Sequence, residues 1–309
     1  MQVYTHLDCL RKYNGEGHPE KKERLVSILD SIKQIKDIKI NFKEAPLAEM
    51  AVISLVHPKK HMEKIFSNIP KKGLIGVEKE PFADTMLCSH SKNAILRSCG
   101  AGIAAADDLM SKNERSFCAV RPPGHHAETV KAMGFCFINN IAVTTRYLQS
   151  KYKVNKVAII DFDVHHGNGT QEIFYNNETV VYASSHEFPL FPGTGSEEET
   201  GVGNIFNATL KAGIKGKDFI KIFEHKILNP IDKFKPEIIL ISAGFDCHYR
   251  DPLANINLES EDFYEITKKI VELANVHCDG RVISFLEGGY DLIALSESTK
   301  EHLSALNTI

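Results

Sequence analysis

Four polar clusters in the sequence combine histidine, aspartate and tyrosine side chains, which together could bind a divalent metal and transfer protons. The clusters are RPPGHH ending at His126, DFDVHH beginning at Asp161, AGFD ending at Asp246 and EGGY ending at Tyr290. Each follows a short apolar run that is typical of a buried parallel strand. Because ligand-binding groups in an open α/β sheet lie beyond the carboxyl ends of the strands, we expect the four clusters to meet in one cleft.

The densest of these clusters is DFDVHH, in which Asp161, Asp163 and His165 occupy every second position. In an extended backbone such residues project to the same side, so two carboxylates and an imidazole are expected to converge. Such a group suits a divalent metal, and Asp246 from another strand end could complete a set of three protein ligands with an open position for water. The alternative is a turn held together by salt bridges and hydrogen bonds.

Two adjacent histidines and a tyrosine supply groups that could transfer protons and stabilise negative charge. His125 and His126 each bring a hydrogen-bond donor and an acceptor that need partners. The candidate partners are Asp161 and Asn168. Tyr290 follows two glycines, which permit close approach to a ligand, and its phenol could donate a hydrogen bond to an oxyanion opposite the metal. We therefore predict chemistry at a metal with proton transfer.

The elements that position these clusters alternate between strand and helix patterns. Strands are predicted at 117–120, 157–160, 238–241 and 282–286, and helices at 21–35, 91–110, 139–152 and 263–274. This alternation predicts an α/β fold with a mostly parallel central sheet and helices on both faces. The site draws residues from Arg121 to Tyr290 without a linker rich in proline, glycine or serine, so one domain covering 1–309 is expected.

Composition and charge exclude several classes of function. The chain has 309 residues, of which 43% are hydrophobic and 25% charged, enough to bury a large core. A net charge of −3 argues against a nucleic-acid partner. No stretch approaches the roughly 18 apolar residues of a membrane span, so no membrane partner and a cytoplasmic location are expected. Seven cysteines without a CxxC pair indicate a reducing compartment rather than a disulfide framework.

The order of the motifs resembles that of the zinc-dependent histone deacetylase superfamily, and within it that of class II deacetylases and bacterial deacetylase-like amidohydrolases. The matching motifs cover most of the chain and are GHPE at 17–20, RPPGHHA, GFCFINN, DFDVHHGNGTQ, FPGTG, AGFD, DPLA and EGGY. The resemblance implies a single-domain arginase/deacetylase-like α/β fold and hydrolysis of an amide by metal-activated water.

The resemblance also implies two kinds of metal site. The divalent metal is Zn²⁺, with Fe²⁺ as the alternative, and its implied ligands are Asp163, His165 and Asp246. Family members also hold K⁺ near the metal loop. Its implied ligands here are the carbonyls of Asp161, Asp163 and His165 with Ser184 and Ser185.

The catalytic roles that the resemblance implies fall on the histidine pair and the tyrosine. Tyr290 matches the tyrosine that polarises the scissile carbonyl, and His126 matches the general base that then acts as general acid. His125 matches its neighbour, paired with Asp161. Asn168 stands where class I members have aspartate and class II members asparagine, which favours class II.

A substrate channel is implied by the same comparison of motifs. Phe135 and Phe191 match its aromatic walls, Gly134 its floor, and Leu253 a residue at its rim. Arg24 resembles an arginine that lines an inner cavity beneath the metal. Because a polyamine-directed relative carries glutamate at the position of Leu253, we expect an acyl-lysine side chain of a protein or peptide as substrate. An acetylpolyamine or another small acylated amine is the alternative.

Two other classes of function are weighed against a deacetylase. Arginase-like ureohydrolases share the fold but need further carboxylate ligands for a second metal, which are not apparent around DFDVHHGNG. The pair His125 and His126 also favours amide hydrolysis over guanidine hydrolysis. An inactive scaffold would be expected to lack a catalytic residue, and every expected position is filled. The sequence does not determine acyl length or oligomeric state.

Overall fold

Runs of valine and isoleucine form the middle of a parallel sheet in the computed structural model, which describes residues 1–78 and 84–308. The sheet has eight strands in the order β2-β1-β5-β10-β9-β6-β7-β8, and every neighbouring pair is parallel. Their bounds are β1 Gln2–Thr5, β2 Asn41–Glu44, β5 Ser116–Cys118, β6 Val157–Asp161, β7 Val180–Glu187, β8 Ile205–Leu210, β9 Ile238–Ala243 and β10 Val282–Leu286.

Burial of the central strands makes this sheet a firm base for the loops that follow it. Every residue of β6, β9 and β10 is buried, as expected for strands covered on both faces. Burying each valine, leucine or isoleucine side chain contributes roughly 1.5–3 kcal/mol to folding. The loops after these strands therefore start from fixed points at one edge of the sheet.

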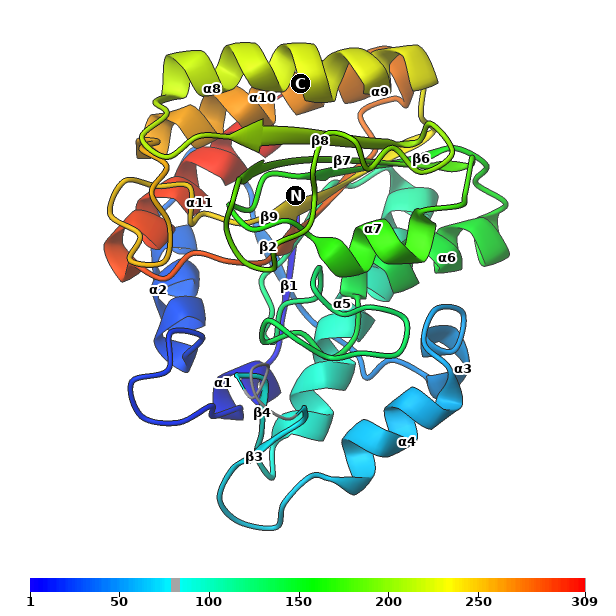
Figure 1. Cartoon of the computed structure of the whole chain (residues 1–309), viewed down its shortest axis with the longest axis vertical. Coiled ribbons are helices and arrows are strands. Elements are labelled where there is room, and N and C mark those ends of the chain that lie inside the picture. Colours follow the sequence, from blue (N-terminus) through cyan, green and yellow to red (C-terminus); the bar gives the residue numbers. More distant parts are fainter. Residues whose placement is uncertain (79–83, 309) are drawn as a thin grey trace.

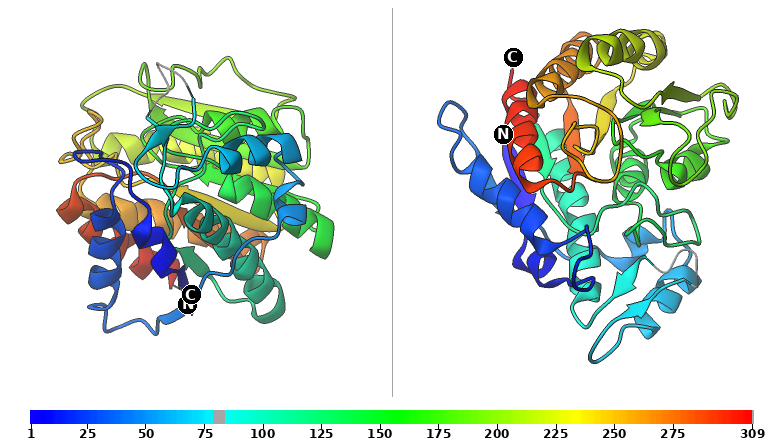
Figure 2. Two further views of the ribbon diagram at one scale, coloured as in Figure 1. Left: turned by 90° about the horizontal axis from the view of Figure 1, so that it is seen from below. Right: turned by 60° about the vertical axis from the view of Figure 1, so that its left-hand side comes forward.

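Helices cover both faces of the sheet, as Figure 1 shows with α8, α9 and α10 on one side and α5, α6 and α7 on the other. Figure 2 shows the same layers from two further directions. The helical segments are α1 Leu7–Arg11, α2 Lys22–Ile32, α3 Met50–Ile53, α4 Lys59–Ser67, α5 Ser91–Lys112, α6 Asn140–Tyr152, α7 Asn168–Phe174, α8 Gly216–Phe223, η1 Glu224–Leu228, α9 Asn229–Phe234, α10 Ser260–His277 and α11 Leu292–Leu306. The expected α/β fold is thus confirmed.

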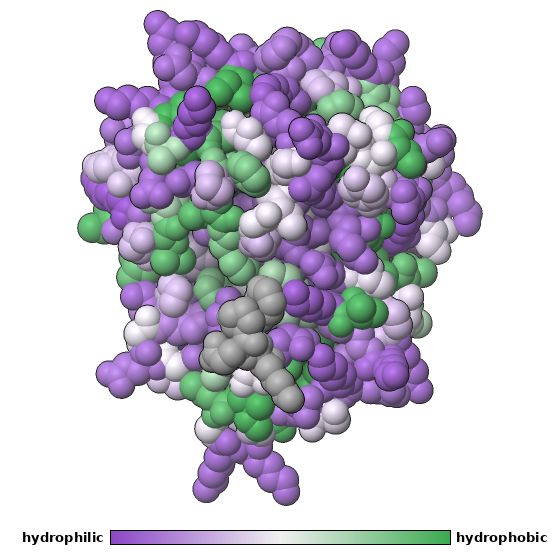
Figure 3. All heavy atoms as spheres, in the orientation of Figure 1, coloured by the Kyte–Doolittle hydropathy of each residue, from purple (hydrophilic) through white to green (hydrophobic). Residues whose placement is uncertain are grey.

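A smaller part of the chain lies beyond one end of the main sheet. It contains α3, α4 and the antiparallel pair β3 Ile75–Gly76 and β4 Met86–Leu87. The face drawn in Figure 3 is mainly hydrophilic, with small groups of hydrophobic residues between the polar ones. Among the described residues, no helix combines the length and the apolar character needed to span a bilayer.

Differences from the predicted elements lie at their ends. The helix predicted at 263–274 begins earlier, at Ser260, because Glu259 and Asp262 form a reciprocal capping box ahead of the first apolar residue. The helix predicted at 21–35 ends at Ile32. The strand predicted at 117–120 ends at Cys118, where its ladder with β1 and β10 stops.

Candidate active site

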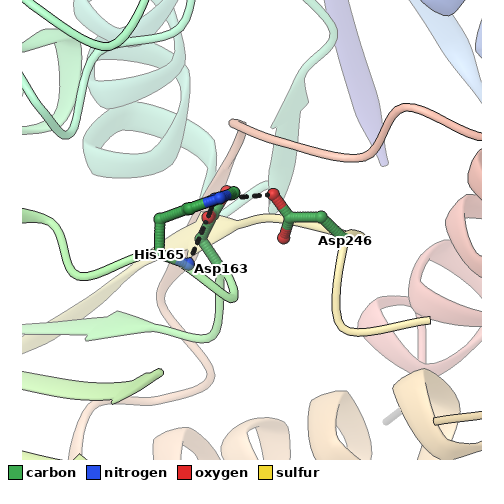
Figure 4. A group of neighbouring side chains, drawn as sticks. All are labelled: Asp163, His165 and Asp246. Carbon is green, nitrogen blue, oxygen red and sulfur yellow. Dashed lines mark hydrogen bonds and ion pairs between the residues drawn. The ribbon is translucent and has the colours of Figure 1, made fainter. Parts of the chain in front are cut away.

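Asp163, His165 and Asp246 form a buried group that could hold a metal ion. One ligand atom from each lies within 4.8 Å of the others. Figure 4 shows the three side chains pointing toward one another, Asp163 and His165 from the loop after β6 and Asp246 from the loop after β9. His165 Nδ1 lies 3.1 Å from Asp163 Oδ1 and 3.2 Å from Asp246 Oδ2. Two carboxylates and one imidazole are a donor set that suits Zn²⁺.

Backbone groups fix the two carboxylates of this group. The Gly288 N–H donates to Asp163 Oδ2 at 2.7 Å, and the Val164 N–H donates to Asp246 Oδ1 at 2.9 Å. Two positions next to these carboxylates require glycine. A Cβ at Gly244 would overlap the Asp163 carboxylate, and a Cβ at Gly288 would overlap the Asp246 carboxylate. The backbone therefore approaches both carboxylates closely and sets their direction.

Asp161 is not part of this group, which corrects the expectation that alternation would make its carboxylate converge with the side chains of Asp163 and His165. Strand β6 ends at Asp161, so the extended backbone on which that expectation depends does not continue. Asp161 Oδ2 lies 3.0 Å from His125 Nδ1 and accepts a hydrogen bond from the Tyr182 hydroxyl, also at 3.0 Å. Burial would lower the pKa of His125, but the carboxylates of Asp163 and Asp161 raise it to about 10.

His126 has the opposite electrostatic environment. Its Nδ1 lies 2.9 Å from Asn168 Oδ1, so the amide oxygen accepts the Nδ1 proton and the lone pair is left on Nε2. Burial and the nearby imidazoles of His125 and His165 hold the pKa of His126 well below its usual range. These surroundings favour the cationic form of His125 and the neutral form of His126.

Tyr290 is held from two sides. Its backbone N–H donates to Asp251 Oδ2 at 2.7 Å. The Arg24 guanidinium lies against its ring and donates hydrogen bonds to the backbone carbonyls of Glu287 and Gly289. Burial raises the pKa of the Tyr290 phenol well above its usual value, so the hydroxyl remains a proton donor.

A cavity of about 230 Å³ joins these groups. Its lining includes His126, His165 and Tyr290 together with the predicted channel residues Gly134, Phe135, Phe191 and Leu253. The Phe191 ring centroid is 5.1 Å from that of His126, and the Phe135 centroid is 6.1 Å from that of Tyr290. Asp84 and Leu190 also line the cavity, and neither was predicted from the sequence.

Several supporting residues were also missed. Glu287 is buried and accepts hydrogen bonds from the N–H groups of Gly124 at 2.7 Å and His125 at 3.2 Å, which ties the histidine turn to β10. Asp251 Oδ1 accepts the N–H of Leu253 at 3.0 Å while Oδ2 holds Tyr290. Glu287 begins the motif EGGY and Asp251 begins the motif DPLA, so the motifs pointed to both residues. Their hydrogen-bond partners, however, are distant in the sequence, and the motifs did not indicate them.

The two serines named for K⁺ lie at buried positions of β7, next to the metal loop. The Ser184 hydroxyl is 2.9 Å from His186 Nδ1. The Ser185 hydroxyl is buried and has no hydrogen-bond partner among the described residues.

Comparison with known proteins agrees with this arrangement. A model of the histone deacetylase domain matches residues 18–306. The chain is 36% identical to "Histone deacetylase 10, chloroplastic" of Oryza sativa subsp. japonica, over 95% of this chain and 70% of that protein. It is 34% identical to a "Probable deacetylase" of Archaeoglobus fulgidus, over 94% of this chain and 81% of the relative. The crystal structure of the HDA15 HD domain superposes with a TM-score of 0.89 at 30% identity, covering 99% of this chain and 90% of that chain.

Proposed function

The chain belongs to the histone deacetylase family, and from that membership we propose that it is a zinc-dependent hydrolase that removes acetyl or other acyl groups from lysine side chains of proteins or peptides. Membership establishes the general activity, which is hydrolysis of an amide to release an acyl group. The observation that carries the proposal is that one cavity is lined by His126, His165 and Tyr290 together with the aromatic rings of Phe135 and Phe191.

Zinc is the proposed metal because Asp163, His165 and Asp246 supply two carboxylates and an imidazole within 4.8 Å of one another. A zinc ion held there would supply Lewis-acid chemistry, lowering the pKa of a water molecule to about 7 and polarising a carbonyl. Iron(II) remains the alternative, since the same ligand types bind it.

The side chains of the cavity divide the proton transfers between them. His126 is neutral and carries its lone pair on Nε2, so it takes the proton of the attacking water and returns it to the leaving nitrogen. The phenol of Tyr290 donates a hydrogen bond to the oxyanion that develops from the scissile carbonyl. His125 is paired with Asp161, and the raised pKa of His125 favours its charged form next to His126.

An acyl-lysine substrate is supported by the residues that line the cavity. Phe135 and Phe191 provide apolar surfaces for the four-carbon stem of lysine, and Leu253 places an apolar group beside them. A small acylated amine is the second candidate because Asp84 also lines the cavity. Its carboxylate could pair with the free ammonium group of an acetylpolyamine.

Potassium is a further part of the proposal. The carbonyls of Asp161, Asp163 and His165 would hold it with Ser184 and Ser185. Ser184 is paired with Asp161 in the β6–β7 ladder, which supports its place in this ligand set.

A substrate panel tests the proposed activity. Zinc-loaded protein is assayed with acetyl-lysine peptides, longer acyl-lysine peptides, acetylputrescine and acetylspermidine, with agmatine as the guanidine control. Turnover of the peptides is the expected result. Turnover of the free amines alone would move the assignment to the small-amine candidate, and turnover of agmatine would contradict both.

A further inference from the structure

We propose that Glu128 is a positioning residue that fixes the orientation of the Asn168 side-chain amide and thereby the position of the proton on His126. The role rests on the proposed function, in which His126 accepts a proton at Nε2. Glu128 follows the histidine pair by two positions and contacts neither Tyr290 nor the metal-holding group in any hydrogen bond described for it. Its effect would be exerted through Asn168.

Hydrogen bonds account for every polar atom of the Asn168 amide. Its Nδ2 donates to Glu128 Oε1 at 2.7 Å and to Met133 Sδ at 3.3 Å, while its Oδ1 faces His126 Nδ1 at 2.9 Å. A carboxylate only accepts hydrogen bonds, so Glu128 requires the NH₂ end of the amide. Rotating the amide by half a turn would place its oxygen against the carboxylate and its NH₂ against His126 Nδ1.

The proton on His126 follows from this orientation. With the amide oxygen toward the ring, Nδ1 carries the proton and Nε2 has the lone pair. With the NH₂ toward the ring, Nδ1 would have to accept and the proton would move to Nε2. Glu128 therefore selects the tautomer in which His126 can act as a base.

Backbone packing fixes the relative positions of His126, Glu128 and Asn168. Asn168 begins α7, and the Thr170 N–H in the same turn donates to the His125 carbonyl at 3.1 Å. Gly169 lies so close to Ala127 that a Cβ there would overlap the Ala127 carbonyl. The start of α7 and the turn that carries the histidines are thus packed against each other. The Asn168 side-chain amide can then change its orientation mainly by rotation about the Cβ–Cγ bond.

The negative charge of Glu128 explains why a neutral asparagine, rather than an aspartate, suits position 168. An aspartate at 168 would place a second carboxylate at hydrogen-bond distance from Glu128 Oε1, and the two negative charges would repel each other. With glutamine at 128, the amide NH₂ could donate to that aspartate, and the pair would again be complementary. The effect of Asn168→Asp should therefore depend on the residue at 128.

A double-mutant cycle tests this dependence. Asn168→Asp is expected to lower kcat/KM by roughly tenfold or more with Glu128 present, and by clearly less in the Glu128→Gln background. The control is Glu172→Gln, since the Glu172 carboxylate accepts hydrogen bonds from the Thr129 N–H and hydroxyl and is not among the hydrogen-bond partners described for the Asn168 side-chain amide. Equal losses in the two backgrounds would overturn the proposal.

The histidine tautomer provides a readout that does not depend on turnover. In ¹⁵N spectra of the zinc-loaded protein, the imidazole signal that disappears in His126→Ala should report a proton on Nδ1. In Glu128→Ala this signal should shift toward a mixture of tautomers, whereas Glu172→Gln should leave it unchanged. An unchanged signal in Glu128→Ala would refute the positioning role. An inactive wild-type protein would refute the proposed function instead, because the signal still reports the amide orientation.

Discussion

The guanidinium of Arg24 lies over the ring of Tyr290, with its central carbon 4.8 Å from the ring centroid. The same group donates hydrogen bonds to the carbonyls of Glu287 and Gly289, both at 2.6 Å. A residue of α2 thus holds the segment that carries the phenol. Arg24 is fully buried, which shields these contacts from bulk solvent.

Replacing Arg24 by lysine should therefore displace Tyr290 without removing the positive charge. A lysine ammonium is a compact charge that does not reproduce the planar fork of arginine. We expect kcat to fall by about tenfold or more, because small misplacements of a catalytic group are costly, while zinc content stays unchanged. Steady-state kinetics and metal analysis check this. Arg250→Lys is the matched control, since Arg250 lies over the exposed Tyr249 ring at 5.3 Å.

Removing the phenol of Tyr290 should separate catalysis from metal binding. In Tyr290→Phe the ring remains but the donor to the oxyanion is lost, which typically costs about 10²–10³ in kcat. Metal stoichiometry should be that of the wild type. Tyr249→Phe serves as control. Near-wild-type turnover of an acyl-lysine peptide by Tyr290→Phe would remove the residue from its assigned role.

Asp246→Asn should weaken metal binding. The substitution replaces one of the two carboxylates of the metal-holding group by a neutral amide of the same size. We expect a lower zinc stoichiometry and a matching loss of activity, measured by metal analysis after dialysis. Asp218→Asn, at an exposed carboxylate on α8, is the control. Full zinc occupancy in Asp246→Asn would take this residue off the list of ligands.

Stability should fall in acid partly through His302, a buried histidine that does not line the catalytic cavity. Its ring nitrogens lie 2.6 Å from the Thr267 hydroxyl and 2.8 Å from the Ser284 hydroxyl. Burial lowers the pKa of His302 from 6.5 to about 3. The unfolded chain therefore binds a proton at His302 at a higher pH than the folded protein does. Its contribution to stability is complete above pH 6.5 and is lost progressively as the pH falls toward 3.

His302→Gln isolates this contribution. One such group changes the free energy of unfolding by up to about 1.4 kcal/mol per pH unit in that window. Urea denaturation at several pH values should give a shallower acid slope for His302→Gln than for the wild type, whatever the difference at neutral pH. Parallel slopes would show that His302 is not the group responsible.

The central strands were predictable because they are buried on both faces. Val157–Asp161 and Ile238–Ala243 are nearly continuous apolar runs followed by polar motifs, so both the strand and the edge at which its loop emerges could be inferred. The edge strand Asn41–Glu44 gave no such signal, because most of its side chains are exposed. Its place is set by backbone pairing with β1, which a hydrophobic pattern does not encode.

The residues of the site divide in a similar way. Those in contiguous motifs, such as His165 and His126, could be named from the sequence, and both line one cavity in the structure. The contacts of Glu128 with Asn168 and of Asp251 with Tyr290 join segments 40 and 39 positions apart, so neither spacing nor composition indicated them. The alternation of Asp161 with Asp163 misled because alternation applies only while the strand continues.

The missing side chains at Gly244 and Gly288 have a practical consequence for engineering. Any substitution there would push against the Asp163 or Asp246 carboxylate, so both codons should be held constant in a mutant library. Diversity is better introduced at Leu190 and Leu253, which line the cavity and are not among the metal-holding side chains. A library built in this way would vary which molecules enter while preserving the machinery that acts on them.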